Sequence, residues 1–132
     1  MKHEPQLHHG ARRIVPNSLE TVVEMFTLLG CKISYREGGA RWAMIGQNGI
    51  DFDIQLVEVD ETPIQTKTRT SSHIAFISES PKTIIGKVNS WAKHKNVRFV
   101  TGGWNEKELW FDLPDLFVDF VVEIMDRSVV EG

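Results

Sequence analysis

Hydrophobic and polar residues follow two periods along this chain, and the order of the periods occurs twice. Residues 8–15 predict a short strand, and apolar residues at helical spacing from Leu19 to Leu29 predict a helix with Ser18 as its N-cap. Three strands are predicted to follow, over residues 31–35, 41–45 and 51–59. The first half of the chain therefore predicts the order β-α-β-β-β.

A polar, threonine-rich segment, residues 61–71, separates this unit from a second unit with the same order. A strand over residues 73–77 precedes a helix that opens at Ser80 and Pro81, because proline suits the first helical position. The remaining strands are predicted over residues 97–100, 109–112 and 116–125, with turns at Gly102–Gly103 and Pro114–Asp115. By position, Trp42 matches Trp110, and residues 53–57 match residues 119–123.

The alternation in the last strand of each unit predicts which side chains lie against a helix. Those expected beneath the helices are Phe52, Ile54 and Leu56 in the first unit and Phe120, Val122 and Ile124 in the second. The residues left on the opposite face are Asp53, Gln55, Asp119 and Glu123. Polar groups on the inner face of a cupped sheet are costly unless they meet water, a ligand or a metal, so we expect chemistry on that face.

These patterns predict an α+β fold in which two βαβββ units form a cupped, barrel-like pair of sheets, with one helix packed on the outside of each. We expect one domain over residues 1–132. Its modules would span about residues 7–60 and 72–126, with the polar linker 61–71 between them.

Composition and charge narrow the class of protein. The 132 residues are 41% hydrophobic, which supplies one domain core, and the net charge of −3 gives no reason to expect a nucleic acid or an anionic membrane as partner. Cys31 is the only cysteine, which excludes an intrachain disulfide and a cysteine-rich zinc site. No apolar run is long enough to span a bilayer and the first residues do not resemble a signal peptide, so we expect a soluble cytoplasmic protein.

Four short motifs, in this order, resemble the vicinal oxygen chelate superfamily. They are the histidine-containing start at residues 7–9, the helix SLETVVEMF at 18–26, SHIAF at 72–76, which resembles "GHIAF", and FDLPD at 111–115, which resembles "DPDG". The superfamily includes glyoxalase I, bleomycin-resistance proteins, fosfomycin-resistance enzymes and extradiol dioxygenases. The resemblance covers about residues 7–126.

The resemblance implies a divalent metal site, because metal-binding members take ligands from the first and last strand of each unit. The matching positions are His9 (His8 if the register differs by one), Gln55, His73, and Asp119 or Glu123. Such ligands suit Zn, Ni, Mn, Fe or Co. The resemblance then implies a metal-dependent lyase, isomerase, transferase or dioxygenase that acts on a small oxygenated substrate. Catalytic residues and the substrate stay unassigned.

Two departures from the family pattern keep a second interpretation open. Gln55 stands where several members have Glu, and an amide cannot act as a general base. The turn before the last strand lacks glycine, which leaves Asp119 and Glu123 as alternatives, and Asp119 has a salt bridge to Arg13 or Arg41 as a structural alternative.

The second interpretation is a metal-free binding protein whose cup captures a small aromatic or hydrophobic ligand. The residues expected to line that cup are Trp42, Trp104 and Trp110. In either case the resemblance implies a homodimer, because many members build their cups from paired units, sometimes swapped between chains.

Overall fold

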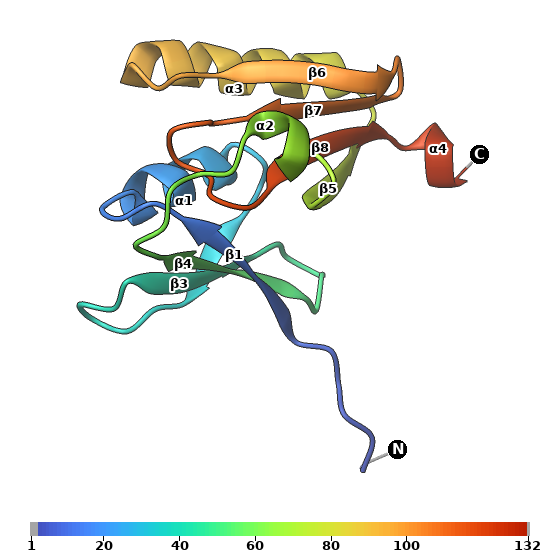
Figure 1. Cartoon of the computed structure of the whole chain (residues 1–132). Coiled ribbons are helices and arrows are strands. Elements are labelled where there is room, and N and C mark those ends of the chain that lie inside the picture. Colours follow the sequence, from blue (N-terminus) through green and yellow to red (C-terminus); the bar gives the residue numbers. More distant parts are fainter. Residues whose placement is uncertain (1–2, 132) are drawn as a thin grey trace.

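Strand, helix and three further strands occur twice in the computed structural model, which describes residues 3–131 (Figure 1). The first module consists of β1 (His9–Ile14), α1 (Leu19–Thr27), β2 (Lys32–Tyr35), β3 (Trp42–Gly46) and β4 (Asp53–Glu58). The second consists of β5 (His73–Ser78), α3 (Pro81–Lys95), β6 (Val100–Asn105), β7 (Glu108–Asp112) and β8 (Val121–Asp126). The predicted α+β fold with two βαβββ units is confirmed.

Each module has one four-stranded mixed sheet with the same topology. Sheet A has the strand order β1-β4-β3-β2, and sheet B has the order β5-β8-β7-β6. In both sheets the first and last strand of the module run parallel and the other neighbours run antiparallel. Helix α1 packs on sheet A and α3 on sheet B, which leaves each sheet one face without its helix, here called the open face.

Helix α1 joins the two modules in the interior. It lies above the strands of sheet A, between them and the second module (Figure 1). The Phe26 ring lies 6.2 Å from the ring of Phe76 in β5, and Glu24 accepts a hydrogen bond of 2.8 Å from the Trp91 indole of α3. Burial of Phe26 and of core residues from both sheets, among them Leu56 and Ile124, forms one hydrophobic cluster.

The N-terminus of α1 is capped by a different side chain from the one predicted. Ser18 occupies the N-cap position, but its hydroxyl donates to the Val15 carbonyl at 2.6 Å. The Glu58 carboxylate of β4 accepts a 3.0 Å hydrogen bond from the Leu19 amide instead. A carboxylate at this end of a helix also interacts favourably with the helix dipole, so the cap ties α1 to its own sheet.

Two of the predicted strands are wrong in extent. The Val97 amide donates to the Ala92 carbonyl, so residues 97–99 follow the end of α3 and β6 begins at Val100. The predicted turn at Gly102–Gly103 lies inside β6, and the chain turns at residues 106–107. Gly102 is needed for a close approach, since a Cβ there would come within 2.5 Å of the Trp110 ring.

The predicted last strand, residues 116–125, is replaced by a shorter β8. The segment before β8 pairs with the edge of β1, where Phe117 bridges Ile14 and the Val118 amide donates to the Arg13 carbonyl at 3.0 Å. Asp119 and Phe120 therefore precede the strand. Phe120 is fully buried all the same, with its ring 4.2 Å from that of Phe117.

The segment predicted as a polar linker contains a short helix, α2 (Thr66–Arg69), that reaches the open face of sheet B (Figure 1). Arg69 is 1% exposed, donates at 2.6 Å to the fully buried Asp112 of β7, and also donates to the Phe117 carbonyl. A buried ion pair of this kind holds the segment against sheet B. A final short helix, α4 (Ser128–Glu131), ends the described chain, and none of the helices described is long and apolar enough to cross a membrane.

Candidate functional site

His73 and Glu123 meet on the open face of sheet B. They come from the neighbouring strands β5 and β8, and His73 Nε2 lies 3.2 Å from Glu123 Oε1. His73 Nδ1 lies 2.9 Å from the Thr70 carbonyl oxygen. Because a carbonyl can only accept, Nδ1 carries the proton, and in the neutral ring Nε2 presents a lone pair to the carboxylate. This contact therefore needs a proton or a cation between the two groups.

The Glu123 carboxylate is buried, lacks a partner on one oxygen among the described residues and has a raised pKa. Its side chain is 5% exposed, and Oε2 has no hydrogen-bond partner among the described residues. Burial raises the pKa of Glu123, and the neighbouring Glu108 also raises it, although His73 opposes both effects. A buried polar atom without a partner is rare in native proteins, which makes this carboxylate a candidate for binding an ion or a ligand.

Sheet A carries His9 and Gln55 at the equivalent positions. In β1–β4 the residue opposite Gln55 is Ala11, two after His9, and in β5–β8 the residue opposite Glu123 is Ala75, two after His73. This equivalence corrects the predicted alignment of the two units by two residues. It also places His9 within a strand, while His8 precedes it with its Nδ1 2.9 Å from His9 Nδ1.

The predicted ligand positions lie apart in a single chain. Across residues 3–131 no three His, Cys, Asp or Glu side chains gather closely enough to hold a metal ion. Asp119 has another partner, because its Oδ1 accepts a 3.0 Å hydrogen bond from the Arg13 amide and its Oδ2 lies 3.5 Å from Arg13 Nε. The structure thus brings together His73 and Glu123, with His9 and Gln55 as a second pair on the other sheet.

The three predicted tryptophans are divided between the two sheets. Trp104 is 47% exposed, and its ring centroid lies 5.0 Å from that of His73. Trp110 is half-buried in β7, directly opposite Glu123. Trp42 belongs to β3 of sheet A, where Tyr35 stacks on it at 5.8 Å. Both sheets therefore present aromatic rings beside their polar groups.

Two contributors to these sites were missed at the sequence level. The sequence shows that Tyr35 is an aromatic residue in a predicted strand. It does not show that β2 pairs with β3, which is what stacks Tyr35 on Trp42. The Thr70 carbonyl that orients His73 follows α2, in a segment expected to be only a linker. A backbone carbonyl leaves no signal in the residue types.

Comparison with solved structures identifies the fold. A protein from Bacillus halodurans assigned as a glyoxalase has 16% identity and a TM-score of 0.62, over 95% of this chain and 98% of that chain. The fosfomycin resistance protein FosX from Mesorhizobium loti has 13% identity and a TM-score of 0.59, over 97% and 96%. TnmS3, an antibiotic binding protein from Streptomyces sp. CB03234, has 13% identity and a TM-score of 0.55, over 94% and 97%.

No family model and no curated protein matches the sequence. The structural neighbours all span nearly the whole chain, and they include glyoxalase-like, lactoylglutathione lyase and fosfomycin resistance proteins. The chain therefore has the fold of the vicinal oxygen chelate superfamily, as its short motifs suggested. This fold is shared by enzymes and by binding proteins, so activity has to be argued from the site.

Proposed function

We propose that this protein is a glyoxalase-like, divalent-metal-dependent enzyme that acts on a small oxygenated substrate. The observation that carries the proposal is the buried Glu123 carboxylate, with one oxygen unpartnered among the described residues and the other facing the Nε2 lone pair of His73. An imidazole nitrogen and a carboxylate are first-choice ligands for a divalent ion of this type.

The orientation of His73 supports the same conclusion. Metal-binding histidines commonly donate their second ring N–H to a carbonyl or carboxylate, which fixes the tautomer and aims the free nitrogen at the metal. The Thr70 carbonyl has this role for His73. A bound divalent ion would supply Lewis acidity to adjacent oxygens of a substrate.

Two ligands from one chain do not complete a metal site, so we propose that a second copy supplies the others. His9 and Gln55 hold the equivalent positions on sheet A. His9 begins the edge strand β1, whose other end pairs with residues 116–118, and Gln55 lies on the neighbouring strand β4. A homodimer that joins sheet A of one copy to sheet B of the other would place all four around one ion. Gln55 would contribute an amide oxygen but could not move a proton.

Metal titration of single variants tests the ligand set. We expect isothermal titration with Ni²⁺ or Zn²⁺ to show binding by the wild type and by His94→Ala, whose imidazole lies exposed on α3. Binding should be lost or weakened at least tenfold in His73→Ala and Glu123→Gln. Equal binding by His73→Ala and the wild type would contradict the proposal.

A mixing experiment tests whether the site is shared between copies. His9→Ala and His73→Ala should each bind no metal alone. After unfolding and refolding together, half of the dimers carry both chains, and each has one intact site of two, so about a quarter of the wild-type binding should return. A site built within one chain would give no recovery.

A second function, binding of a small aromatic or hydrophobic ligand without metal, is favoured by the aromatic rings on both open faces. Trp104 over His73 and Tyr35 over Trp42 offer flat apolar surfaces beside polar groups. We expect aromatic ligands to quench tryptophan fluorescence in metal-free protein and in Trp91→Phe, and to quench it less in Trp104→Phe. Quenching that is equal in all three proteins would argue against this function.

A further inference from the structure

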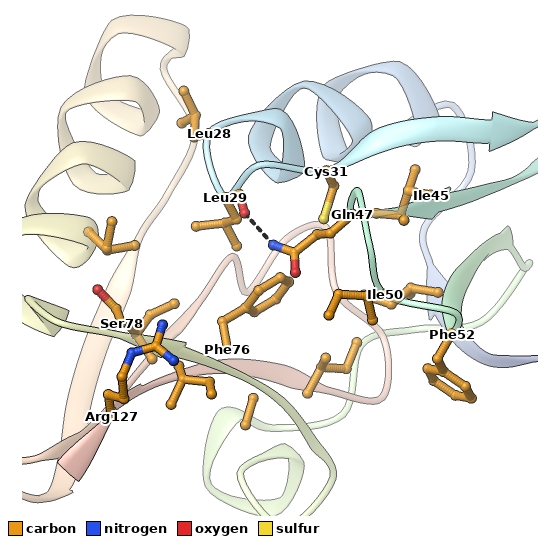
Figure 2. Close-up of a pocket in the computed structure, with 17 residues that line it drawn as sticks. Leu28, Leu29, Cys31, Ile45, Gln47, Ile50, Phe52, Phe76, Ser78 and Arg127 are labelled. Carbon is orange, nitrogen blue, oxygen red and sulfur yellow. Dashed lines mark hydrogen bonds between the residues drawn. The ribbon is translucent and has the colours of Figure 1, made fainter. Parts of the chain in front are cut away.

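A cavity of about 540 Å³ lies between the two modules. Its walls are apolar residues of the segment after α1, of both sheets and of α3 (Figure 2). Among them are Leu29, Ile45, Ile54, Phe76, Ile84 and Ile124. His73 and Glu123 do not line it, so it is separate from the open-face site. The volume lies within the range of small-molecule sites, roughly 300–1,000 Å³.

The cavity has a floor and a mouth, as a ligand site does. Ile45 and Ile124 at the floor are 0% and 1% exposed, whereas Ile50, Phe52 and Ile77 around it are 55%, 38% and 40% exposed. When an apolar occupant covers large apolar side chains that are exposed beside a cavity, the free energy falls, so such side chains favour binding. Phe52 was predicted to pack beneath α1, and its exposure is accounted for by its place in this lining.

The polar groups of the lining are few, and one of them is cationic. Arg127, which follows β8, lies beside Ser78 with its guanidinium at the end of the cavity (Figure 2). Its present partners are carboxylates on the surface, Glu131 at 3.0 Å and Glu79 at 3.9 Å, and both are at least half exposed. Exposed ion pairs contribute little, so a ligand carboxylate can take their place.

We propose that this cavity binds an apolar carboxylate, with the hydrocarbon body between the modules and the carboxylate on Arg127. The apolar walls select the body, and the planar guanidinium selects a carboxylate over a neutral or cationic head group. Since the walls belong to both modules, the occupant bridges them. Cys31 also lines the cavity, and burial raises the pKa of its thiol to about 11, so it adds no negative charge at neutral pH.

Decanoate is the probe for this site, with decanol and decyltrimethylammonium as neutral and cationic controls. In protein with ¹³C-labelled isoleucine methyl groups, decanoate below its micelle concentration should shift the resonances of Ile45, Ile54 and Ile124. The resonances of Ile33 in β2 and Ile64 before α2 should stay in place, because neither lines the cavity. Decanol should shift the same methyl groups at higher concentration, and the cation should bind most weakly.

Variants separate the apolar body from the head group. Arg127→Gln should weaken decanoate about tenfold and leave decanol unchanged, whereas Arg98→Gln, a surface arginine paired with Asp115, should bind both as the wild type does. Leu29→Trp should fill the cavity and abolish both, with unchanged near-ultraviolet circular dichroism showing that the fold persists.

Three results would overturn the proposal. The first is that decanoate shifts only the resonance of Ile33 on sheet A. The second is that decanoate and decanol bind the wild type with equal affinity. The third is that the resonances of the cavity residues shift with the concentration of the protein and not with that of decanoate. The last result would show that a second copy covers the cavity.

Discussion

On the open face of sheet B, the side chains of Asp112 and Glu123 are 0% and 5% exposed, whereas Arg13 of sheet A and its partner Glu61 are 52% and 50% exposed. Both sheets have the same strand order, so topology does not account for the contrast. It arises because α2 and the segment before β8 lie over one end of sheet B and exclude water there. Charges that are buried in this way carry large energies, and an exposed pair such as Arg13 and Glu61 carries a small one.

The largest expected effect comes from breaking the buried pair. Asp112→Asn should lower the free energy of unfolding by about 3–5 kcal/mol, because it leaves the Arg69 guanidinium buried and uncompensated. Urea unfolding measures this. Its counterpart on sheet A, Arg13→Gln, should cost less than about 1 kcal/mol, since solvent screens that pair.

A double variant sharpens this result. Arg69→Met with Asp112→Leu replaces the pair by apolar groups and should recover most of the lost stability. If Asp112→Asn and Arg13→Gln unfold at the same urea concentration, α2 does not bury the pair in solution.

A smaller loss of stability is expected at Gly102 of β6, which lies against Trp110 of β7. Gly102→Ala should lower the free energy of unfolding by about 1–3 kcal/mol, because the new Cβ would overlap the Trp110 ring, and tryptophan fluorescence should change with it. Gly38, before β3 of sheet A, has no atom within 4 Å of an added Cβ. Gly38→Ala should therefore be neutral or stabilising by up to about 1 kcal/mol. Equal losses would mean that Trp110 does not lie over β6.

The smallest expected effect is a gain of stability at the proposed metal site. Burial raises the pKa of Glu123 above its ordinary value of 4.5, so the folded state holds this proton more tightly than the unfolded state. The protonated Glu123 carboxyl contributes its full stability to the folded protein below that ordinary pKa. This stability is lost as the pH rises through the raised pKa of the folded state. Glu123→Gln removes the ionisation, and its amide can donate to His73 Nε2.

Metal-free Glu123→Gln should thus be more stable than the wild type by about 1 kcal/mol at pH 7 and equal to it near pH 4, as thermal unfolding at the two pH values would show. Gln55→Glu introduces a carboxylate at the equivalent position of sheet A and is the matched control. It should leave the pH dependence of stability nearly unaltered. A wild type that gains stability from pH 4 to pH 7 relative to Glu123→Gln would contradict this account of Glu123.

Local signals in the sequence predicted the elements with few errors. Helical spacing located α1 and α3, and alternation located β4, because these patterns reflect burial on one face. The errors lie where a residue type has two uses. Paired glycines are typical of a turn, but Gly102 lies inside β6 and provides room for an aromatic ring. An apolar run is typical of a strand, but the run before β8 pairs with β1 and does not extend β8.

For the candidate site, residue types identified His9, Gln55, His73 and Glu123 through the resemblance to a family, and their roles as ligands stay a prediction. The choice of Arg13 as the partner of Asp119 and the meeting of Glu123 with His73 depended on contacts between segments tens of residues apart. The tautomer of His73 depended on how the backbone turns at Thr70, three residues earlier.

The sequence alone determined the doubled βαβββ order, since periodicity and turn residues act over a few neighbouring positions. Tertiary structure alone decided which polar residues meet, that α2 seals one end of sheet B, and that a cavity remains between the modules. Those features depend on how the two modules pack against each other. Packing depends on the shapes of side chains that are far apart in the sequence, and the pattern of hydrophobic and polar residues does not show which of them meet.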